Sequence, residues 1–249
     1  MAAVGPTTGA GIREEARRAD RSAQERWRRS TRLSQAVMVA EQNRLLAAAV
    51  GTAGRLLEVG AGVGTFLADA SADSRFGRVC AVEVSHQSAK LALAAAGGRA
   101  PVLLAPAENL PFRDGSFDAV VARGVLHHLS DPSAAMREMH RILRPQGRLV
   151  IFEGNPASSY RRAMLGLADL LRIPHEDTQY RHLRPEEISR LLSPFHASRA
   201  APINGMFAPL SYMGIGGPRS WRALMTIRRA VIDAWPSGFA WWLLWIAEK

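Results

Sequence analysis

The sequence predicts an α/β fold in which a mainly parallel sheet has helices on both faces. Between residues 55 and 153, short runs of Val, Leu and Ile alternate with segments of helical periodicity. This alternation is typical of a parallel sheet. A glycine-rich turn joins the first apolar run to the helix that follows it. Hydrophobic residues make up 47% of the 249 residues, which is enough to build a core.

The first 50 residues are expected to lie outside the sheet. Residues 1–10 show no periodicity, whereas Ile12–Val50 has the apolar spacing of a helix and contains no proline. We expect residues 1–50 to form a tail and a helical lid over the main domain, residues 51–249. Trp27 would act as an apolar plug over the ligand site, and ordinary packing of this side chain is the alternative.

Five strands and three helices are expected in the first part of the main domain. Each predicted strand is a short apolar run, and turn residues separate most of these runs from the helical segments. The strands are expected at 55–60, 79–83, 101–105, 117–122 and 148–153, and the helices at 65–70, 88–96 and 132–143. Pro145–Gly147 is predicted to be the turn into the fifth strand.

The alternation ends after Glu153, and two insertions are expected, at about 154–184 and 204–238. Helices are predicted at 158–172, 185–192 and 221–234, a strand at 195–203 and a loop at 204–218. The Trp-rich segment 241–247 is interpreted as a final buried strand. Anchoring of this segment on a membrane surface is the alternative that is not favoured.

Composition and charge narrow the function classes. The single cysteine, Cys80, excludes a disulfide framework and a cysteine-based metal cluster. The seven histidines show no metal-ligand spacing, and the absence of a long apolar segment favours a soluble, cytoplasmic protein. The net charge of +10 lies mainly in the flanks and could attract nucleic acid, a membrane surface or an anionic substrate. A solvated surface is favoured, because no arginine and aromatic residues interleave as in nucleic-acid binding.

The strongest motif is a glycine loop followed by an acidic residue. Gly60, Gly62 and Gly64 alternate with single residues at the end of the first predicted strand, and Glu83 ends the second. Glycines let a ligand approach the backbone, and a carboxylate at this position can bind both ribose hydroxyls. Dinucleotide loops need their third glycine one residue later, so a nicotinamide oxidoreductase is disfavoured. The alternative for the glycine loop is a tight turn that binds no ligand.

Three motifs resemble the class I S-adenosylmethionine-dependent methyltransferases. The segment Glu58–Gly64 resembles the first motif of that family. Ala107–His128, with its Leu-Pro-Phe and Phe-Asp pairs before a Val-rich strand, resembles the next. Arg137–Ile151 resembles the helix, turn and strand that follow. The resemblance covers residues 51–154 and implies a Rossmann-like sheet of seven strands, parallel except for the last.

The resemblance also implies which residues hold the cofactor, S-adenosyl-L-methionine, whose product is S-adenosyl-L-homocysteine. Residues near the methionine group would be Glu58, Gly60, Ala61, Gly62, Gly64 and Arg123, and residues near the adenosine would be Glu83, Val84, Ala107 and Glu108. The family usually has an Asp before the Ala-Glu pair, where this chain has Pro106. Because proline has no acceptor side chain, either Glu108 replaces that acid or the adenine contact is missing.

Methyl transfer to a hydroxyl needs a base, and His127, His128 and Glu153 are the candidates. All three are expected at the carboxyl ends of the fourth and fifth strands, where ligands bind. The arrangement resembles that of O-methyltransferases that act on sugars, which implies His127 as base and Glu153 as its partner. The alternative is that the histidines pack or cap and that Glu153 is a cap or a solvated acid. His175 and His182 are weaker candidates for contact with the substrate.

The function expected is transfer of a methyl group to a small, hydrophobic acceptor, with O-methylation favoured, on a secondary metabolite or a lipid- or sugar-linked molecule. The hydrophobic character rests on an apolar cluster within residues 206–221, for which plain core is an equal alternative. Methylation of RNA or protein, and a cofactor-binding module without turnover, remain as alternatives. A nucleic-acid partner and contact with a membrane are not favoured, and a homodimer is left open.

Overall fold

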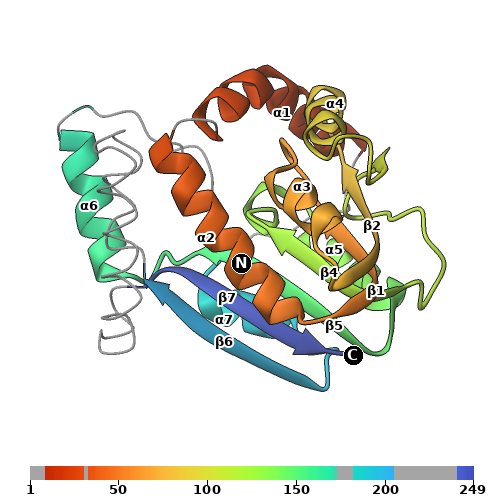
Figure 1. Ribbon diagram of the computed structural model, residues 1–249. Coiled ribbons are helices and arrows are strands. Elements are labelled where there is room, and N and C mark those ends of the chain that lie inside the picture. The colour runs from red at the N-terminus through yellow and green to blue at the C-terminus, as the bar shows by residue number, and fades with distance from the viewer. Residues whose placement is uncertain (1–8, 31–32, 171, 173–181, 205–239) are drawn as a thin grey trace.

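The computed structural model describes residues 9–30, 33–170, 172, 182–204 and 240–249 (Figure 1). The helices are α1 (Gly9–Ser30), α2 (Leu33–Val50), α3 (Thr65–Ala72), α4 (His86–Ala95), α5 (Pro132–Ile142), α6 (Ser159–Leu170) and α7 (Pro185–Leu191), with a short 3-10 turn, η1 (Leu126–His128). The strands are β1 (Ala53–Val59), β2 (Phe76–Glu83), β3 (Val102–Leu104), β4 (Phe117–Arg123), β5 (Leu143–Gly154), β6 (Ala197–Asn204) and β7 (Ala240–Glu248). The predicted loop 204–218 (from residue 205 on) and helix 221–234, His175 and the apolar cluster lie outside the described residues.

The seven strands form one sheet in the order β3-β2-β1-β4-β5-β7-β6. All neighbouring pairs from β3 to β5 are parallel, and β7 runs antiparallel to both β5 and β6. This topology confirms the predicted Rossmann-like, mostly parallel α/β sheet. β7 is also confirmed as a buried strand, since Trp241, Trp242 and Trp245 are each less than a tenth exposed.

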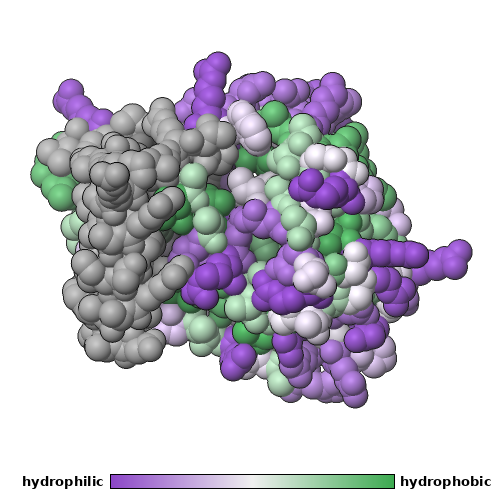
Figure 2. All heavy atoms as spheres, viewed as in Figure 1, coloured by the Kyte–Doolittle hydropathy of each residue, from purple (hydrophilic) through white to green (hydrophobic). Residues whose placement is uncertain are grey.

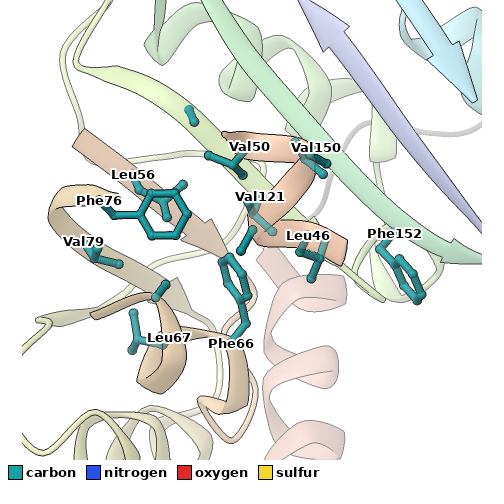
Figure 3. Close-up of a cluster of buried hydrophobic side chains, with 14 of the residues drawn as sticks. Leu46, Val50, Leu56, Phe66, Leu67, Phe76, Val79, Val121, Val150 and Phe152 are labelled. Carbon is teal, nitrogen blue, oxygen red and sulfur yellow. The ribbon is translucent and has the colours of Figure 1, made fainter. Parts of the chain in front are cut away.

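Apolar side chains alternate between the two faces of the sheet. Leu56 of β1 and Val121 of β4 point toward α2 and α3, and Figure 3 shows them meeting Leu46 and Phe66 from those helices. Their chain neighbours, such as Leu57, point to the opposite face, where α5 and α7 pack. Both faces are therefore buried, which explains why the strands are continuous apolar runs.

Most boundaries lie within three residues of the sequence prediction, and two differences are larger. The single helix expected over Ile12–Val50 is two helices, α1 and α2. The turn expected at Pro145–Gly147 lies inside β5, which already begins at Leu143. There Gln146 has a φ of 63°, and its N–H donates to the carbonyl of Lys249 at 2.8 Å. Backbone hydrogen bonds with Lys249, the residue after β7, thus keep β5 extended across the expected turn.

Hydrophilic and hydrophobic side chains interleave over the described part of the face seen in Figure 2. In Figure 1, α1 crosses above the sheet next to α4, while α2 lies along one face of the sheet. Among the described helices, none is both long enough and apolar enough to cross a membrane.

Candidate active site

The strand order reverses between β1 and β4, and this is where a ligand crevice is expected in an open parallel sheet. A cavity of about 560 Å³ lies there. Its walls come from the segments that follow β1, β2, β3 and β4, and from helix α1. The cavity therefore stands at the carboxyl ends of the strands that carry the glycine loop and the acidic residue.

The glycine loop leaves no room for side chains at two of its positions. Gly60 has a φ of +71°, and a Cβ on it would lie 2.5 Å from Cγ2 of Val125. Gly64 has a φ of +80°, and a Cβ there would lie 2.5 Å from the Cα of Ala92 in α4. Gly60 thus keeps the loop against the segment after β4 at the cavity wall, whereas Gly64 permits the contact between α3 and α4 beneath it.

Glu83 is fixed by backbone donors at the end of β2. Its Oε2 accepts the N–H of Gly62 at 2.7 Å, and its Oε1 accepts the N–H of Ser85 at 2.9 Å. The residue is 6% exposed, and burial raises the pKa of its carboxyl despite these two bonds. Each oxygen keeps a second lone pair, so the carboxylate can still accept from two hydroxyl groups in the cavity.

Arg123, at the end of β4, is held by residues from two helices. It donates from one terminal nitrogen to Oδ1 of Asn43 at 2.8 Å and from the other to Oγ1 of Thr65. Asn43 donates in turn to Oδ2 of Asp69 at 2.7 Å. The sequence analysis missed Asn43, because helix α2 is far from the motifs in sequence and only the fold brings this 4%-exposed amide to the site.

Glu58 lies beneath the glycine loop and not in the wall of the cavity. It is 1% exposed, and its Oε2 accepts no hydrogen bond among the described residues. Burial, with a smaller contribution from Glu83, raises the pKa of Glu58 to about 8, against the opposing charge of Arg123. This carboxyl therefore belongs to the same buried electrostatic group as Arg123 and Glu83.

His127 and Glu153 form a hydrogen-bonded pair that is largely buried. Nδ1 of His127 lies 2.7 Å from Oε2 of Glu153, and Oε1 of Glu153 accepts the N–H of Leu126 at 2.7 Å. The two side chains are 12% and 4% exposed. The register between β4 and β5 explains the meeting, because Arg123 pairs with Phe152, the residue before Glu153. A carboxylate that accepts from Nδ1–H leaves the lone pair of a neutral imidazole on Nε2.

His128 lines the same cavity, with its ring centroid 4.1 Å from that of His127. Burial, followed by the neighbouring His127, lowers the pKa of His128 to about 3. Its imidazole is therefore neutral at physiological pH. A neutral His128 does not repel a cationic ligand in the cavity.

His182 joins this group from the segment before α7. Its ring centroid lies 4.7 Å from that of His127, and ligand atoms of His127, Glu153 and His182 lie within 4.8 Å of one another, as in a metal site. However, a terminal nitrogen of Arg161 lies 2.9 Å from Nε2 of His182. Arginine is always a donor, so Nε2 accepts and the proton of a neutral His182 sits on Nδ1. The guanidinium and this proton together oppose a cation at the cluster.

Helix α1 lines one side of the cavity and is hydrogen-bonded to the start of α4. Oδ1 of Asp20 accepts the hydroxyl of Ser85 at 2.5 Å and the N–H of Gln87 at 3.0 Å. Arg26 donates to Oγ of Ser88 at 2.9 Å and contributes to the cavity wall, whereas Trp27 does not. Helix α1 thus contributes to the cavity wall, whereas Trp27, expected as an apolar plug, is not among the residues that line the cavity.

The predicted site residues divide into those in the cavity wall and those behind it. Lining the cavity are Gly60, Ala61, Gly62, Glu83, Val84, Ala107, Arg123, His127 and His128. The predicted residues that do not line the cavity are Glu58, Gly64, Glu108 and Glu153. The N-terminal contribution to the wall, by Glu15 and Arg26 among others, was not predicted.

Comparison with known proteins identifies the domain. The pattern of the methyltransferase-domain family matches residues 57–151, from β1 to β5. A ubiquinone/menaquinone biosynthesis C-methyltransferase of Geotalea daltonii is 33% identical over 117 residues, which are 47% of this chain and 48% of that protein. The chain spans about half, or less, of the length of these curated relatives.

Solved structures show the same fold over most of the chain. A SAM-dependent methyltransferase of Thermotoga maritima, described as a possible histamine N-methyltransferase, superposes with a TM-score of 0.68 at 19% identity and covers 94% of this chain and 99% of that one. The N-methyltransferase NodS of Bradyrhizobium japonicum, in complex with S-adenosyl-L-homocysteine, gives 0.61 at 15% identity and covers 94% and 98%. Residues 57–151 therefore belong to the methyltransferase-domain family, and the sheet order and the crevice agree with the fold of the class I S-adenosylmethionine-dependent methyltransferases.

Proposed function

We propose that the protein transfers a methyl group from S-adenosylmethionine to a small acceptor with an ionisable hydroxyl group, and that His127 and Glu153 remove the acceptor's proton. The observation that carries this proposal is the 2.7 Å bond between Nδ1 of His127, which lines the cavity, and Oε2 of Glu153 behind it. Such a bond orients the imidazole and stabilises its protonated form.

The residues around the cavity fit the cofactor. Glu83 offers acceptors for the ribose hydroxyls, and the loop at Gly60 permits close approach of a ligand to the backbone. Arg123 stands where the methionine carboxylate would be bound, and the buried Glu58 behind it balances part of that charge. These assignments rest on the geometry of the site and on the likeness to the family.

In the reaction proposed, the cofactor supplies a methyl group on a sulfonium, whose sulfur keeps the bonding electron pair when the acceptor takes the methyl group. The proton of the acceptor hydroxyl moves to Nε2 of His127. Glu153 holds the ring through Nδ1 and stabilises the imidazolium that forms. Helix α1 lines the cavity, and water that it excludes from the bound ligands would strengthen these electrostatic interactions.

A carbon acceptor is the second candidate, because the similar Geotalea protein is named a C-methyltransferase. Loss of a proton from a hydroxyl on an aromatic ring makes a ring carbon nucleophilic, so the same base would serve. The predicted hydrophobic character of the acceptor rests on residues within 206–221, outside the described part of the chain, and it stays a prediction. Methylation of RNA or protein gains no specific support from the described site.

Cofactor binding is tested by ligand-induced stabilisation. S-adenosylhomocysteine at 100 times its Kd should stabilise the protein by about 2.7 kcal/mol and raise its Tm, whereas NADH should not. Glu83→Ala should remove most of this shift, because the ribose hydroxyls lose their acceptor. An NADH-dependent shift, or undiminished binding of S-adenosylhomocysteine by Glu83→Ala, would contradict the assignment of the site.

The base is tested with an acceptor found by screening pools of small hydroxylated molecules with radiolabelled methyl donor. His127→Ala should lower kcat by about 10²- to 10⁴-fold, the usual contribution of a general base. The Kd for S-adenosylhomocysteine should stay within threefold of wild type. His140→Ala is the matched control, because this histidine packs on Phe195 away from the cavity. Unchanged turnover in His127→Ala would exclude the residue as base.

A further inference from the structure

The end of the cavity beyond Glu83 is apolar where the sheet supplies its walls. Val84 follows β2, and Ala105, Pro106 and Ala107 follow β3, and all four line the cavity. The adenine of a cofactor whose ribose lies on Glu83 would occupy this end. A purine with an amino group needs a hydrogen-bond acceptor there, because a buried donor without one costs about 1–3 kcal/mol.

Helix α1 brings two carboxyl groups to the wall of the cavity, those of Glu14 and Glu15, and they differ in their partners. Oε1 of Glu14 accepts from Nε of Arg18 at 3.1 Å and lies 3.6 Å from Arg21, both on the same helix. The carboxyl of Glu15 instead lies within electrostatic reach of Glu83 and of Glu108, which follows the apolar wall. Glu15 is thus the acid of α1 that both lines the cavity and interacts electrostatically with Glu83 and Glu108.

The position of Glu15 is set by the docking of α1. Glu15, Ala19, Ala23 and Arg26 follow one another at helical spacing along one face of α1, and Ala23 is fully buried. Arg26 bonds Ser88 at one end of this face. The helix therefore presents Glu15 to the cavity in a defined register.

The protonation state of Glu15 suits a purine edge. Burial, followed by the charges of Glu108 and Glu83, raises the pKa of Glu15 to about 8, so this group is mostly protonated at neutral pH. A protonated carboxyl offers an O–H donor beside a carbonyl acceptor. Adenine offers the complementary pair, an amino donor beside a ring-nitrogen acceptor.

We propose that Glu15 of helix α1 reads the adenine of the cofactor, accepting from its 6-amino group and donating to the adjacent ring nitrogen. This inference rests on the proposed cofactor site. The N-terminal helix α1 would then form part of the cofactor-binding site. It would supply the hydrogen-bond acceptor that the chain lacks at Pro106.

The test is the preference for an amino group at position 6 of the purine. Isothermal titration calorimetry gives the Kd of S-adenosylhomocysteine and of its analogue with hydrogen in place of that amino group. The wild-type protein should prefer S-adenosylhomocysteine by roughly tenfold, because the analogue leaves a buried acceptor unpaired. Glu15→Ala should reduce this preference to less than about twofold, since the acceptor is gone.

Two further variants separate the contact from a general effect on the helix. Glu15→Gln should keep the preference, because an amide also pairs an acceptor and a donor with adenine. Glu14→Ala should keep it too, since that carboxylate is paired with Arg18. If Glu15→Ala weakens both ligands equally and keeps the tenfold preference, or changes neither, the role of Glu15 is overturned while the cofactor site stands. If the wild-type protein binds neither ligand, the proposed function itself fails.

Discussion

His128 sits next to His127 in the cavity wall, and its environment couples the stability of the protein to pH. The pKa of His128 is lowered to about 3 from an ordinary value of 6.5. Between these two values the unfolded chain binds a proton that the folded chain does not. The contribution of this residue to the free energy of unfolding therefore falls as the pH falls, by about 1.4 kcal/mol per pH unit.

We predict that His128→Gln removes this dependence. Urea unfolding at pH 6.5 and pH 5 gives the free energy of unfolding of both proteins. The free energy of the variant, relative to that of the wild type, should rise as the pH is lowered, because glutamine does not titrate. Comparison of the two proteins cancels the opposite effects of Glu15 and Glu58, whose raised pKa values make the folded state bind protons in the same range. Parallel stability curves for the two proteins would contradict the prediction.

Residue positions were predictable from sequence where the motif is local. The glycine loop and Glu83 lie at the ends of two consecutive strands, so their meeting followed from the sheet alone. The pairing of His127 with Glu153 was also expected, since both follow neighbouring strands. Asn43 and Glu15 were not found, because each reaches the site through the packing of a helix. The local sequence of a helix does not indicate which part of the molecule each of its exposed positions will contact.

Among the elements, α1 depends on a small number of polar contacts for its position. Oδ1 of Asp20 accepts two bonds at the start of α4, from Ser85 and from Gln87. Helix starts have backbone N–H groups without intrahelical partners, and an acid that accepts from them is worth about 1 kcal/mol. Asp20 thus acts as a supplementary cap for α4 and holds α1 against the start of α4.

We predict that Asp20→Ala loosens α1 while the sheet stays intact. The free energy of unfolding should fall by about 1 kcal/mol, the cost of losing a cap. Hydrogen exchange should rise over α1 and the first turn of α4, and the affinity for S-adenosylhomocysteine should fall. Arg17→Ala, an exposed change on the same helix, is the control and should leave both unchanged. Equal hydrogen exchange in Asp20→Ala and wild type would show that the hydrogen bonds of Asp20 are not needed to hold α1 in place.

Element boundaries were predicted best where the sequence carries a stop signal. The break between α1 and α2 was missed because Ile12–Val50 contains neither proline nor glycine. The start of β5 was missed for the opposite reason, since Pro145 and Gly147 signal a turn but the sheet overrides it. Backbone bonds between Gln146 or Gly147 and Lys249 stabilise the extended segment there.

At the scale of the whole molecule, the sheet is held together by strands that are distant in sequence. β7 lies between β5 and β6 and pairs with both along its length. Its residues 240–247 are all buried. The lid helix α1, by contrast, lies outside the sheet and is joined to it through α4 and α2.

We predict that the two ends of the chain tolerate truncation very differently. A chain that stops at residue 239 should fail to fold cooperatively, because β5 and β6 lose their common partner and apolar side chains of both faces become exposed. A chain that begins at Leu33 should keep its near-ultraviolet circular dichroism and a cooperative transition, with weakened binding of S-adenosylhomocysteine. A cooperative transition in the first truncation would show that β7 is not required.

The placement of β7 also bears on biosynthesis. While the nascent chain emerges from the ribosome, strands β1 to β5 can associate, since β1 to β4 have all their neighbours already synthesised and β5 has β4. β6 emerges next but has nothing to pair with until residues 240–248 follow. The edge of the incomplete sheet at β5 thus stays unpaired while the segment between β6 and β7 is translated. During this interval the exposed strand is most open to aggregation, and a chaperone would protect it most.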